Sequence, residues 1–227
     1  FTPSLQLIPD NELIFSATAI DFDIATYVKE AGGYLSTYRE YLGTTEWTTG
    51  ARAIERLAGI TVPARARALR VVLLELERLY NHTADIGALA TDVAFTVPAS
   101  RAQALREGLV RLHDQLFGTR LLRGTIALGG VTRDLPPESC DALRAHLHGF
   151  EKKFDELIRL LVDAGTFTDR VDGAGVLSQQ AARDLGIVGM AARASGVDGD
   201  LRRDHPNDAY EGLHFDVPVE DGGDARA

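Results

Sequence analysis

The sequence predicts a mainly α-helical fold, with a helical bundle core and irregular, partly β segments at the N- and C-termini. The first observation is that apolar side chains recur every three or four residues through the middle of the chain, which is the period of an amphipathic helix. The second is that Gly and Pro bound these periodic stretches. The third is that both ends of the chain lack this period. We therefore divide the chain into an N-terminal α+β segment, residues 1–50, and a helical domain, residues 51–227.

The N-terminal segment predicts short strands followed by short helices. The stretch LQLIPDNELIFSATAI, residues 5–20, supplies two short strands about a Pro9-Asp10-Asn11 turn. Residues 24–43 predict two short helical pieces that are interrupted by a pair of glycines. The stretch GARAIERLAGI, residues 50–60, then predicts a short helix that ends at Gly59.

Two long helices follow. Pro63 suits a first helical position, and the helix after it runs to about Phe95. Its apolar positions fall on one face: Leu69, Val72, Leu73, Leu76, Leu79, Tyr80, Thr83, Ile86 and Val93. The next helix starts near Pro98 and ends at Gly118. Its apolar face carries Leu105, Leu109, Leu112 and Leu116.

A connector and a last long helix complete the predicted bundle. The connector has a short extended piece and a Gly129-Gly130 turn, and a helix begins between Asp134 and Pro137 with Asp134 as its N-cap. The apolar face of that helix is formed by Leu143, Leu147, Phe150, Phe154, Leu157 and Leu161. The chain is irregular after Gly165, apart from one short helix with an N-cap at Ser178 and Gly186 beyond its end.

Composition excludes several classes of function. The net charge of -9 and the pI of about 5.1 make nucleic acid and an anionic membrane surface unsuitable direct partners. The single cysteine, Cys140, excludes an internal disulfide and a cysteine-ligated metal cluster held by this chain alone. No run reaches the roughly 18 apolar residues that span a bilayer, and the N-terminus does not resemble a signal peptide. We expect a reduced, cytoplasmic protein, and its ends lead us to expect a piece of a longer one.

The candidate site lies on the first long helix. Steps of three and four place one stripe of residues opposite its apolar face: Glu75, Arg78, His82, Asp85, Leu89 and Asp92. For the first half of this stripe we expect a solvated face with ion pairs between Glu75 and Arg78 and between His82 and Asp85. Asp85 and Asp92 have small or apolar neighbours, so we expect them to be buried, with pKa values raised toward neutrality by desolvation. The alternatives for Asp92 are a proton-exchanging group and a helix-end cap or structural pair.

Other patterns give weaker signals. The glycines of GGVTRDLP lack the frame of a phosphate loop and predict only a turn. A charged stretch near the C-terminus contains Arg193, Asp198, Asp200, Arg202, Arg203, Asp204, His205 and Asp208. If it is buried it needs internal charge pairing, and if it is exposed it is only a solvated surface. Its aspartates lack the spacing of a calcium loop. The histidines have no metal-ligand spacing and no hydrolase arrangement is present, so we expect no metal site.

Several motifs resemble one known family. They are PARARALRVVLLELERLYNHTADIGALATDVAF, RLLRGTIALGGVTRDL, RVDGAGVLSQQAARDLGIVGMAARASGVDGDLRRDHPNDAY and FDVPVEDGGD, in this order. Together they resemble the quinone-site 49 kDa (D) subunit of respiratory complex I and the large subunit of membrane-bound nickel–iron hydrogenases of the formate-hydrogenlyase type. The resemblance covers about residues 51–227. The motifs of the long helix and of the charged stretch lean toward the hydrogenase branch.

The resemblance implies a helical oxidoreductase subunit of a membrane-bound electron-transfer complex, peripheral on the inner face of the membrane through partner subunits. It implies an iron–sulfur small subunit as partner, a quinone as electron acceptor, and proton uptake at Asp92. His82 and Asp85 would support that acid electrostatically. The segment from Arg193 to His205 would lie near the small-subunit interface.

Departures from the family pattern are equally specific. Nickel–iron members hold the metal with two C-x-x-C motifs; the first would fall at Arg39 and Leu42, and the sequence ends before the second. No nickel–iron site is therefore expected here. Residues 1–50 lack the family's recognisable hairpin, and Ala127 replaces the arginine expected before Gly129-Gly130. The alternative function is a catalytically inactive docking subunit or fragment that has lost the metal ligands. A nucleotide-binding enzyme would need a phosphate loop, which this sequence lacks.

Overall fold

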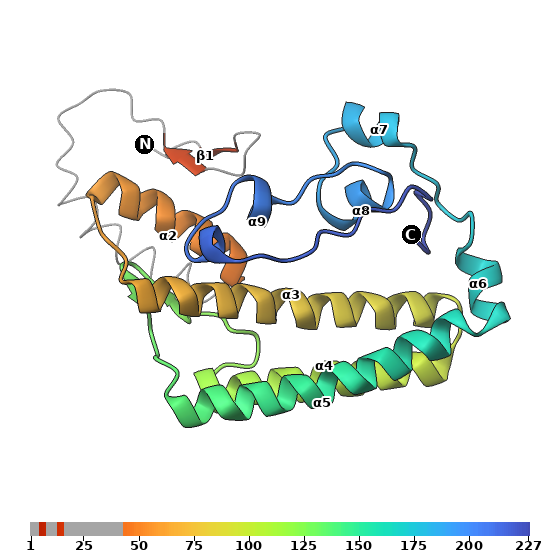
Figure 1. The fold of residues 1–227 in the computed structure, drawn as a ribbon, viewed down its shortest axis with the longest axis horizontal. Helices are drawn as coiled ribbons and strands as arrows, with labels where there is room; N and C mark the ends of the chain where they lie inside the picture. The colour runs from red at the N-terminus through yellow and green to blue at the C-terminus, as the bar shows by residue number, and fades with distance from the viewer. Residues whose placement is uncertain (1–4, 8–12, 16–42) are drawn as a thin grey trace. The chain divides into compact units, whose positions relative to one another are not determined.

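The structure is a computed structural model that describes residues 5–7, 13–15 and 43–227. These residues are mainly helical, as predicted (Figure 1). The chain forms two compact units: unit 1 contains residues 1–81 and 107–144, and unit 2 contains residues 82–106 and 145–227. Three long helices contribute residues to both units: α3 (Ala64–Asp92), α4 (Thr96–Phe117) and α5 (Pro137–Val162).

The N-terminal hairpin of unit 1 confirms the two predicted strands. β1 (Leu5–Leu7) and β2 (Leu13–Phe15) pair in antiparallel fashion, with Gln6 opposite Ile14. The predicted Pro9-Asp10-Asn11 turn and the helical pieces predicted within residues 24–43 lie outside the described residues, apart from Gly43.

Helix α2 (Thr44–Ala58) is longer than predicted, and residue 50 lies within it. Its buried residues Trp47, Ala51 and Ile54 follow helical spacing, and Gly59 ends it with φ 64, as predicted. The early start has a cause elsewhere in the chain: the Glu77 carboxylate of α3 accepts hydrogen bonds of 2.7 Å from the backbone N–H groups of the first two residues of α2.

The core of unit 1 follows the predicted helical stripes. Leu73, Leu76 and Tyr80 of α3 are buried, as are Leu109 and Leu112 of α4. The connector forms a small antiparallel hairpin, β3 (Ile126–Ala127) and β4 (Gly130–Val131).

Helix α5 begins at Pro137, and the prediction that Asp134 is its N-cap is wrong. The first helical N–H groups bond to the carbonyl of Pro136, whereas the Asp134 carboxylate accepts from the N–H of Leu135 and from Arg65 of α3. The acid therefore closes a local turn and fastens the connector to α3.

In unit 2 the second half of α3 packs very closely on α4. A Cβ added at Gly87 would lie 3.0 Å from the Cβ of Ala102, so only glycine fits without displacement. After α3 the chain reverses through Ala94, which has φ 60, and the N–H of Phe95 bonds to the carbonyl of Ala90. On α5, Phe150 and Phe154 stack with ring centroids 5.5 Å apart.

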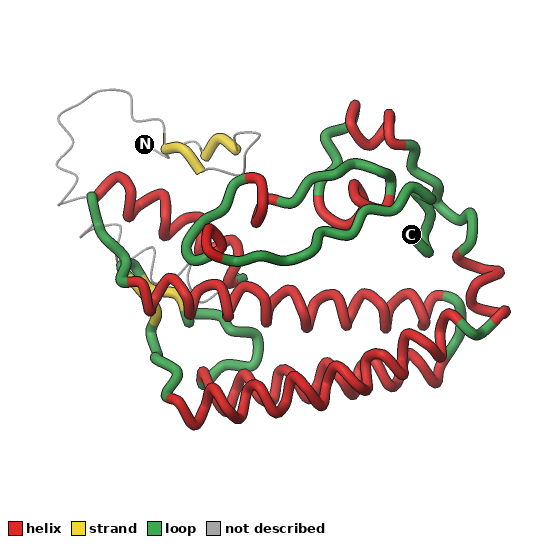
Figure 2. Tube along the Cα trace, in the orientation of Figure 1, coloured by secondary structure: helices red, strands yellow, loops and turns green. Residues whose placement is uncertain are grey.

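The prediction of one short helix after Gly165 is wrong, because residues 165–227 form several short helices joined by loops, as Figure 2 shows. They are α6 (Gly165–Val171), α7 (Gln179–Asp184), α8 (Gly189–Ala194), α9 (Leu201–Asp204) and the 3-10 helix η1 (Tyr210–Gly212). The predicted cap is confirmed, since Ser178 Oγ accepts from the N–H of Ala181, and Gly186 lies beyond α7 with φ 63. Across the described part of the chain, none of the helices combines the length and apolarity needed to cross a membrane.

Candidate functional site

The three predicted site residues lie on the second half of α3, within unit 2. Asp85 and Asp92 are seven residues apart, so they share one face of the helix, about 10 Å apart along its axis. Both carboxylates are exposed, and His82 is half-buried one turn before Asp85. Between the acids the same face carries Ala88, which is also exposed. We call the exposed stripe Asp85, Ala88 and Asp92 the acid face.

The prediction that Asp85 and Asp92 are buried is wrong for this chain by itself. It relied on their small and apolar neighbours, but these have another physical cause. Gly87 is buried because α4 approaches this part of α3 closely, and its lack of a side chain permits that approach. Ala90, three residues later, is also small and buried. Close packing on one side of the helix explains the composition without any cover over the acids on the other side.

Neither acid has a structural partner among the described residues. The carboxylates of Asp85 and Asp92 form no hydrogen bond or ion pair with any residue in that part of the chain. Asp92 is also the last residue of α3, where the negative end of the helix dipole opposes a carboxylate rather than favouring it. The alternative that Asp92 is a helix-end cap or a structural pair therefore lacks support in these residues.

Of the two ion pairs predicted on the stripe, the one between Glu75 and Arg78 is confirmed, whereas the one between His82 and Asp85 is wrong, because Asp85 forms no ion pair with His82. Arg78 Nε lies 3.8 Å from Glu75 Oε2, which confirms the expected pair at the long end of ion-pair distances. Both side chains are about one-third exposed, and such a pair contributes little to stability.

The charged stretch near the C-terminus fits both alternatives in part, because Asp200 is buried and paired, whereas Arg203 and its partners are exposed. The Asp200 carboxylate is almost fully buried and accepts from the Nε and Nη2 of Arg202, at 2.9 and 2.7 Å, and Arg193 lies 3.5 Å away. The hydrogen bonds from Arg202 lower the pKa of Asp200 to about 2. The same guanidinium lies 4.6 Å from the centre of the Phe215 ring. Arg203 pairs separately with Asp198 and Asp204.

The last residues, 219–227, form an irregular C-terminal strap that is hydrogen-bonded to other segments of unit 2. Gly223 donates to the carbonyl of Ala194 at 2.7 Å and accepts from the N–H of Leu177 at 2.8 Å, and so joins two segments far apart in sequence. It has φ 66, and a Cβ added there would lie 2.3 Å from the Leu177 carbonyl oxygen. Gly173 donates to the Asp224 carboxylate, which lowers the pKa of Asp224. Gly223 and Asp224 of the FDVPVEDGGD motif therefore connect the strap to Gly173, Leu177 and Ala194.

The donors present do not fit a nickel–iron centre. Cys140 is the single thiol of the 227 residues, and such a centre needs several thiolates. Within the described ranges no cluster of three or more His, Cys, Asp or Glu side chains is placed to hold a metal ion. Arg39 and Leu42, where the first cysteine pair was expected, lie outside those ranges. No chemical step is therefore assigned to nickel in this chain.

Sequence reasoning missed two buried carboxylates in unit 1. Glu77 holds the start of α2, and Glu55 forms a fully buried ion pair with Arg70. A signal was present for the second: Arg70 lies between Leu69 and Val71 in a run of apolar residues, where a charge requires a partner. The identity of that partner depends on the fold.

A family model matches residues 85–227; its description is the respiratory-chain NADH dehydrogenase 49 Kd subunit. Among curated proteins, one of the NADH-quinone oxidoreductase D subunits of Opitutus terrae is 40% identical over 172 residues, covering 76% of this chain and 40% of that protein. The NADH-quinone oxidoreductase D subunit of Thermus thermophilus is 37% identical over 174 residues, covering 77% of this chain and 42% of that protein. The relatives named here are quinone oxidoreductase subunits, and the leaning toward the hydrogenase branch stays a prediction.

A solved structure also resembles this chain. It is described as the membrane-bound sulfane sulfur reductase, an archaeal respiratory membrane complex, and a chain of it matches with a TM-score of 0.69 and 28% identity. The match covers 74% of this chain and 45% of that chain. The chain thus spans less than half the length of these relatives.

Proposed function

Because this chain belongs to the family of the respiratory-chain NADH dehydrogenase 49 kDa subunit, we propose that it is an oxidoreductase subunit of a membrane-associated electron-transfer complex, with Asp92 as its proton-exchanging acid. The electrons come from an iron–sulfur cluster in a small partner subunit, and a quinone is the acceptor. His82 and Asp85 support Asp92 electrostatically. With a single cysteine in its sequence, the chain cannot hold the cluster by itself.

The acid face carries this proposal. Two carboxylates flank an alanine on a face of α3 that no described residue caps or pairs. The opposite side of the same segment is fixed by the close contact between Gly87 and Ala102. The side of the helix away from the acids is therefore packed against α4, and we propose that a partner subunit covers the acid face in the complex.

Covering the face changes the chemistry of Asp92. A carboxylate that loses water without gaining a hydrogen-bond donor becomes easier to protonate. A protonated Asp92 can donate its proton to a reduced quinone oxygen within hydrogen-bond distance, and proton uptake from solvent then restores it. We therefore propose that Asp92, which is exposed in the chain alone, is buried in the assembled complex.

The test is the variant Asp92→Asn in the purified native complex. General acid–base catalysis contributes roughly a hundredfold or more to rate, so we expect quinone-coupled electron transfer to fall by about that factor. Assembly of the complex, measured by native electrophoresis, should be unchanged, because Asp92 forms no hydrogen bond or ion pair with the described residues. Wild-type turnover in this variant would remove Asp92 from the mechanism.

Asp114→Asn is the matched control. Asp114 is an exposed aspartate close to the end of another long helix, α4, and lies outside the acid face. Its loss should leave turnover at the wild-type rate. If both variants slow electron transfer equally, the effect reflects overall charge and not a proton path.

A docking subunit without proton chemistry is the second candidate. The observation that favours it is a segment of unit 2 with its large apolar side chains outward: Leu185 and Val188 are each 71% exposed and Met190 is 48% exposed, whereas Ala182 and Ala192 are buried. On this hypothesis Val188→Asp releases the chain from the complex, and Asp92→Asn leaves turnover unchanged.

A further inference from the structure

The hairpin between α4 and α5 is too small to define its own shape. Its strands pair at two positions only, Ile126 with Val131 and Ala127 with Gly130, which leaves Leu128 and Gly129 as the loop. Gly129 has φ 76, whereas Leu128 does not have a positive φ. These signs of φ exclude the type I′ and II′ turns, which need a positive φ at the first loop residue. Two-residue hairpins prefer those primed turns because their twist matches that of the strands.

Two charged side chains from the core bind the backbone of this turn instead. Arg70 of α3 donates from Nη2 to the carbonyl of Ala127 at 2.8 Å and from Nε to the carbonyl of Gly130 at 3.1 Å. Glu55 of α2 accepts from the N–H of Gly129 at 2.7 Å. Three backbone polar groups within four residues are thus bonded to one pair of side chains.

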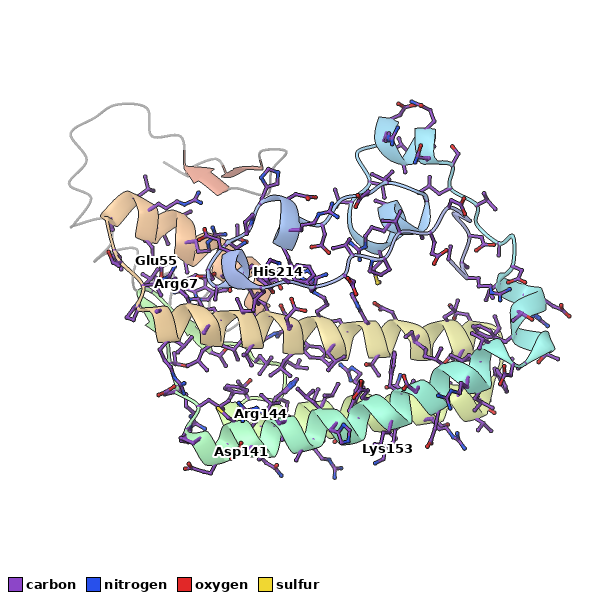
Figure 3. The ribbon with its side chains drawn as sticks, in the orientation of Figure 1. Glu55, Arg67, Asp141, Arg144, Lys153 and His214 are labelled. Carbon is purple, nitrogen blue, oxygen red and sulfur yellow. The ribbon has the colours of Figure 1, made fainter. Side chains whose placement is uncertain are left out.

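The two side chains are also bonded to each other, in fork-to-fork geometry. Arg70 Nη2 lies 2.6 Å from Glu55 Oε1, and Arg70 Nη1 lies 3.0 Å from Glu55 Oε2. The Arg70 side chain is fully buried and that of Glu55 is 5% exposed. Figure 3 labels Glu55 on α2. Leu128 and Gly129 of the turn, by contrast, are only half-buried, so the turn is a surface element held from within.

We propose that Glu55 and Arg70 form a charge clamp that sets the conformation of the turn Ala127–Gly130. A buried ion pair is a weak source of net stability, because the attraction between the charges is offset by the water that both lose. An apolar pair of similar volume could fill the same space. It could not bond two carbonyls and one N–H at once, and this is the property that a turn of disfavoured type requires.

The first test uses amide hydrogen exchange on the full wild-type chain. If the clamp holds the turn, the N–H of Gly129 exchanges only when a large part of the fold unfolds, the same unfolding that exposes the core amide of Leu73. The exchange rates of the two amides then depend on denaturant concentration in the same way. Exchange of Gly129 through small local fluctuations, independent of denaturant, would overturn the proposal.

The second test removes the charges and keeps the volume, in the double variant Glu55→Leu with Arg70→Met. We expect Leu73 to keep its protection within a factor of about three, because no unpaired charge is left buried. Gly129 should exchange at least about tenfold faster, which corresponds to the loss of one charge-assisted hydrogen bond. Unchanged protection at Gly129 would show that the turn does not need the clamp.

Arg65 and Asp134 provide the matched control. They also form an ion pair between α3 and the connector, at 3.0 Å, but their side chains are 59% and 68% exposed. Asp134→Asn should leave the exchange of Gly129 at the wild-type rate. If this variant loosens the turn as much as the double variant does, the effect is general and the proposal fails.

Discussion

The glycine of the C-terminal strap gives a prediction that the structure quantifies closely. In Gly223→Ala the new Cβ would lie 2.3 Å from the Leu177 carbonyl oxygen, a backbone atom that cannot rotate away. The residue also has φ 66, which costs an L-amino acid about 1 to 2 kcal/mol. Displacing the strap breaks the two backbone hydrogen bonds of Gly223, worth about 1 kcal/mol each. We therefore expect the strap to open more easily by about 3 to 4 kcal/mol.

Gly175→Ala separates the two contributions. Gly175 has φ 65 but nothing within 4 Å of its Cβ position, so this variant carries the backbone strain without the clash. The difference of about 2 kcal/mol corresponds to about a thirtyfold faster exchange of the Leu177 amide in Gly223→Ala than in Gly175→Ala. Exchange of the Leu177 amide, followed by mass spectrometry or NMR, measures it. Equal exchange in the two variants, within about threefold, would refute the reasoning.

Three further predictions concern other parts of the chain. Ala94→Gly should raise the free energy of unfolding by about 1 kcal/mol, since Ala94 has φ 60, and thermal unfolding of the variant measures this. The pKa of Asp200 falls from 3.8 in the unfolded chain to about 2, so its stabilising contribution is complete above pH 4 and is lost as the pH falls toward 2. Urea unfolding at several pH values should show this loss, and Asp200→Asn should reduce it. Trp47, the only tryptophan, is buried and donates from Nε1 to the carbonyl of Ile126, so its emission should shift to longer wavelength when unit 1 unfolds. An unshifted emission maximum on full denaturation would contradict its burial.

The helices could be predicted because their signal is local. Leu73, Leu76 and Tyr80 recur at helical spacing, and Gly59 and Gly118 end their helices in the left-handed conformation that favours glycine. The start of α2 could not be predicted in this way. It depends on Glu77, which lies 33 residues further along the chain and binds the first N–H groups of the helix.

The candidate site was predicted less well, for a physical reason. Small residues around an acid are compatible with two arrangements: a helix packed on every side, or a helix that approaches a single neighbour closely. Gly87 belongs to the second arrangement, and Asp92 is exposed in this chain. Local sequence cannot distinguish the two, because the deciding atoms belong to α4, which follows later in the chain.

The buried clamp shows a similar limit. That Arg70 needs a partner follows from its apolar neighbours, but the choice of Glu55 and of the Ala127–Gly130 backbone depends on how α2, α3 and the hairpin pack. Charged residues within apolar runs are therefore useful signals of buried pairs even where their partners are unknown.

The measurement that tests the central claim most directly is a redox-induced infrared difference spectrum of the assembled native complex. If Asp92 exchanges a proton as electrons arrive, reduction changes a carboxyl C=O band, and that band is absent from the Asp92→Asn complex and present in the Asp114→Asn complex. A spectrum that is identical in the wild-type and Asp92→Asn complexes would contradict the account, since the acid would then keep one protonation state throughout turnover.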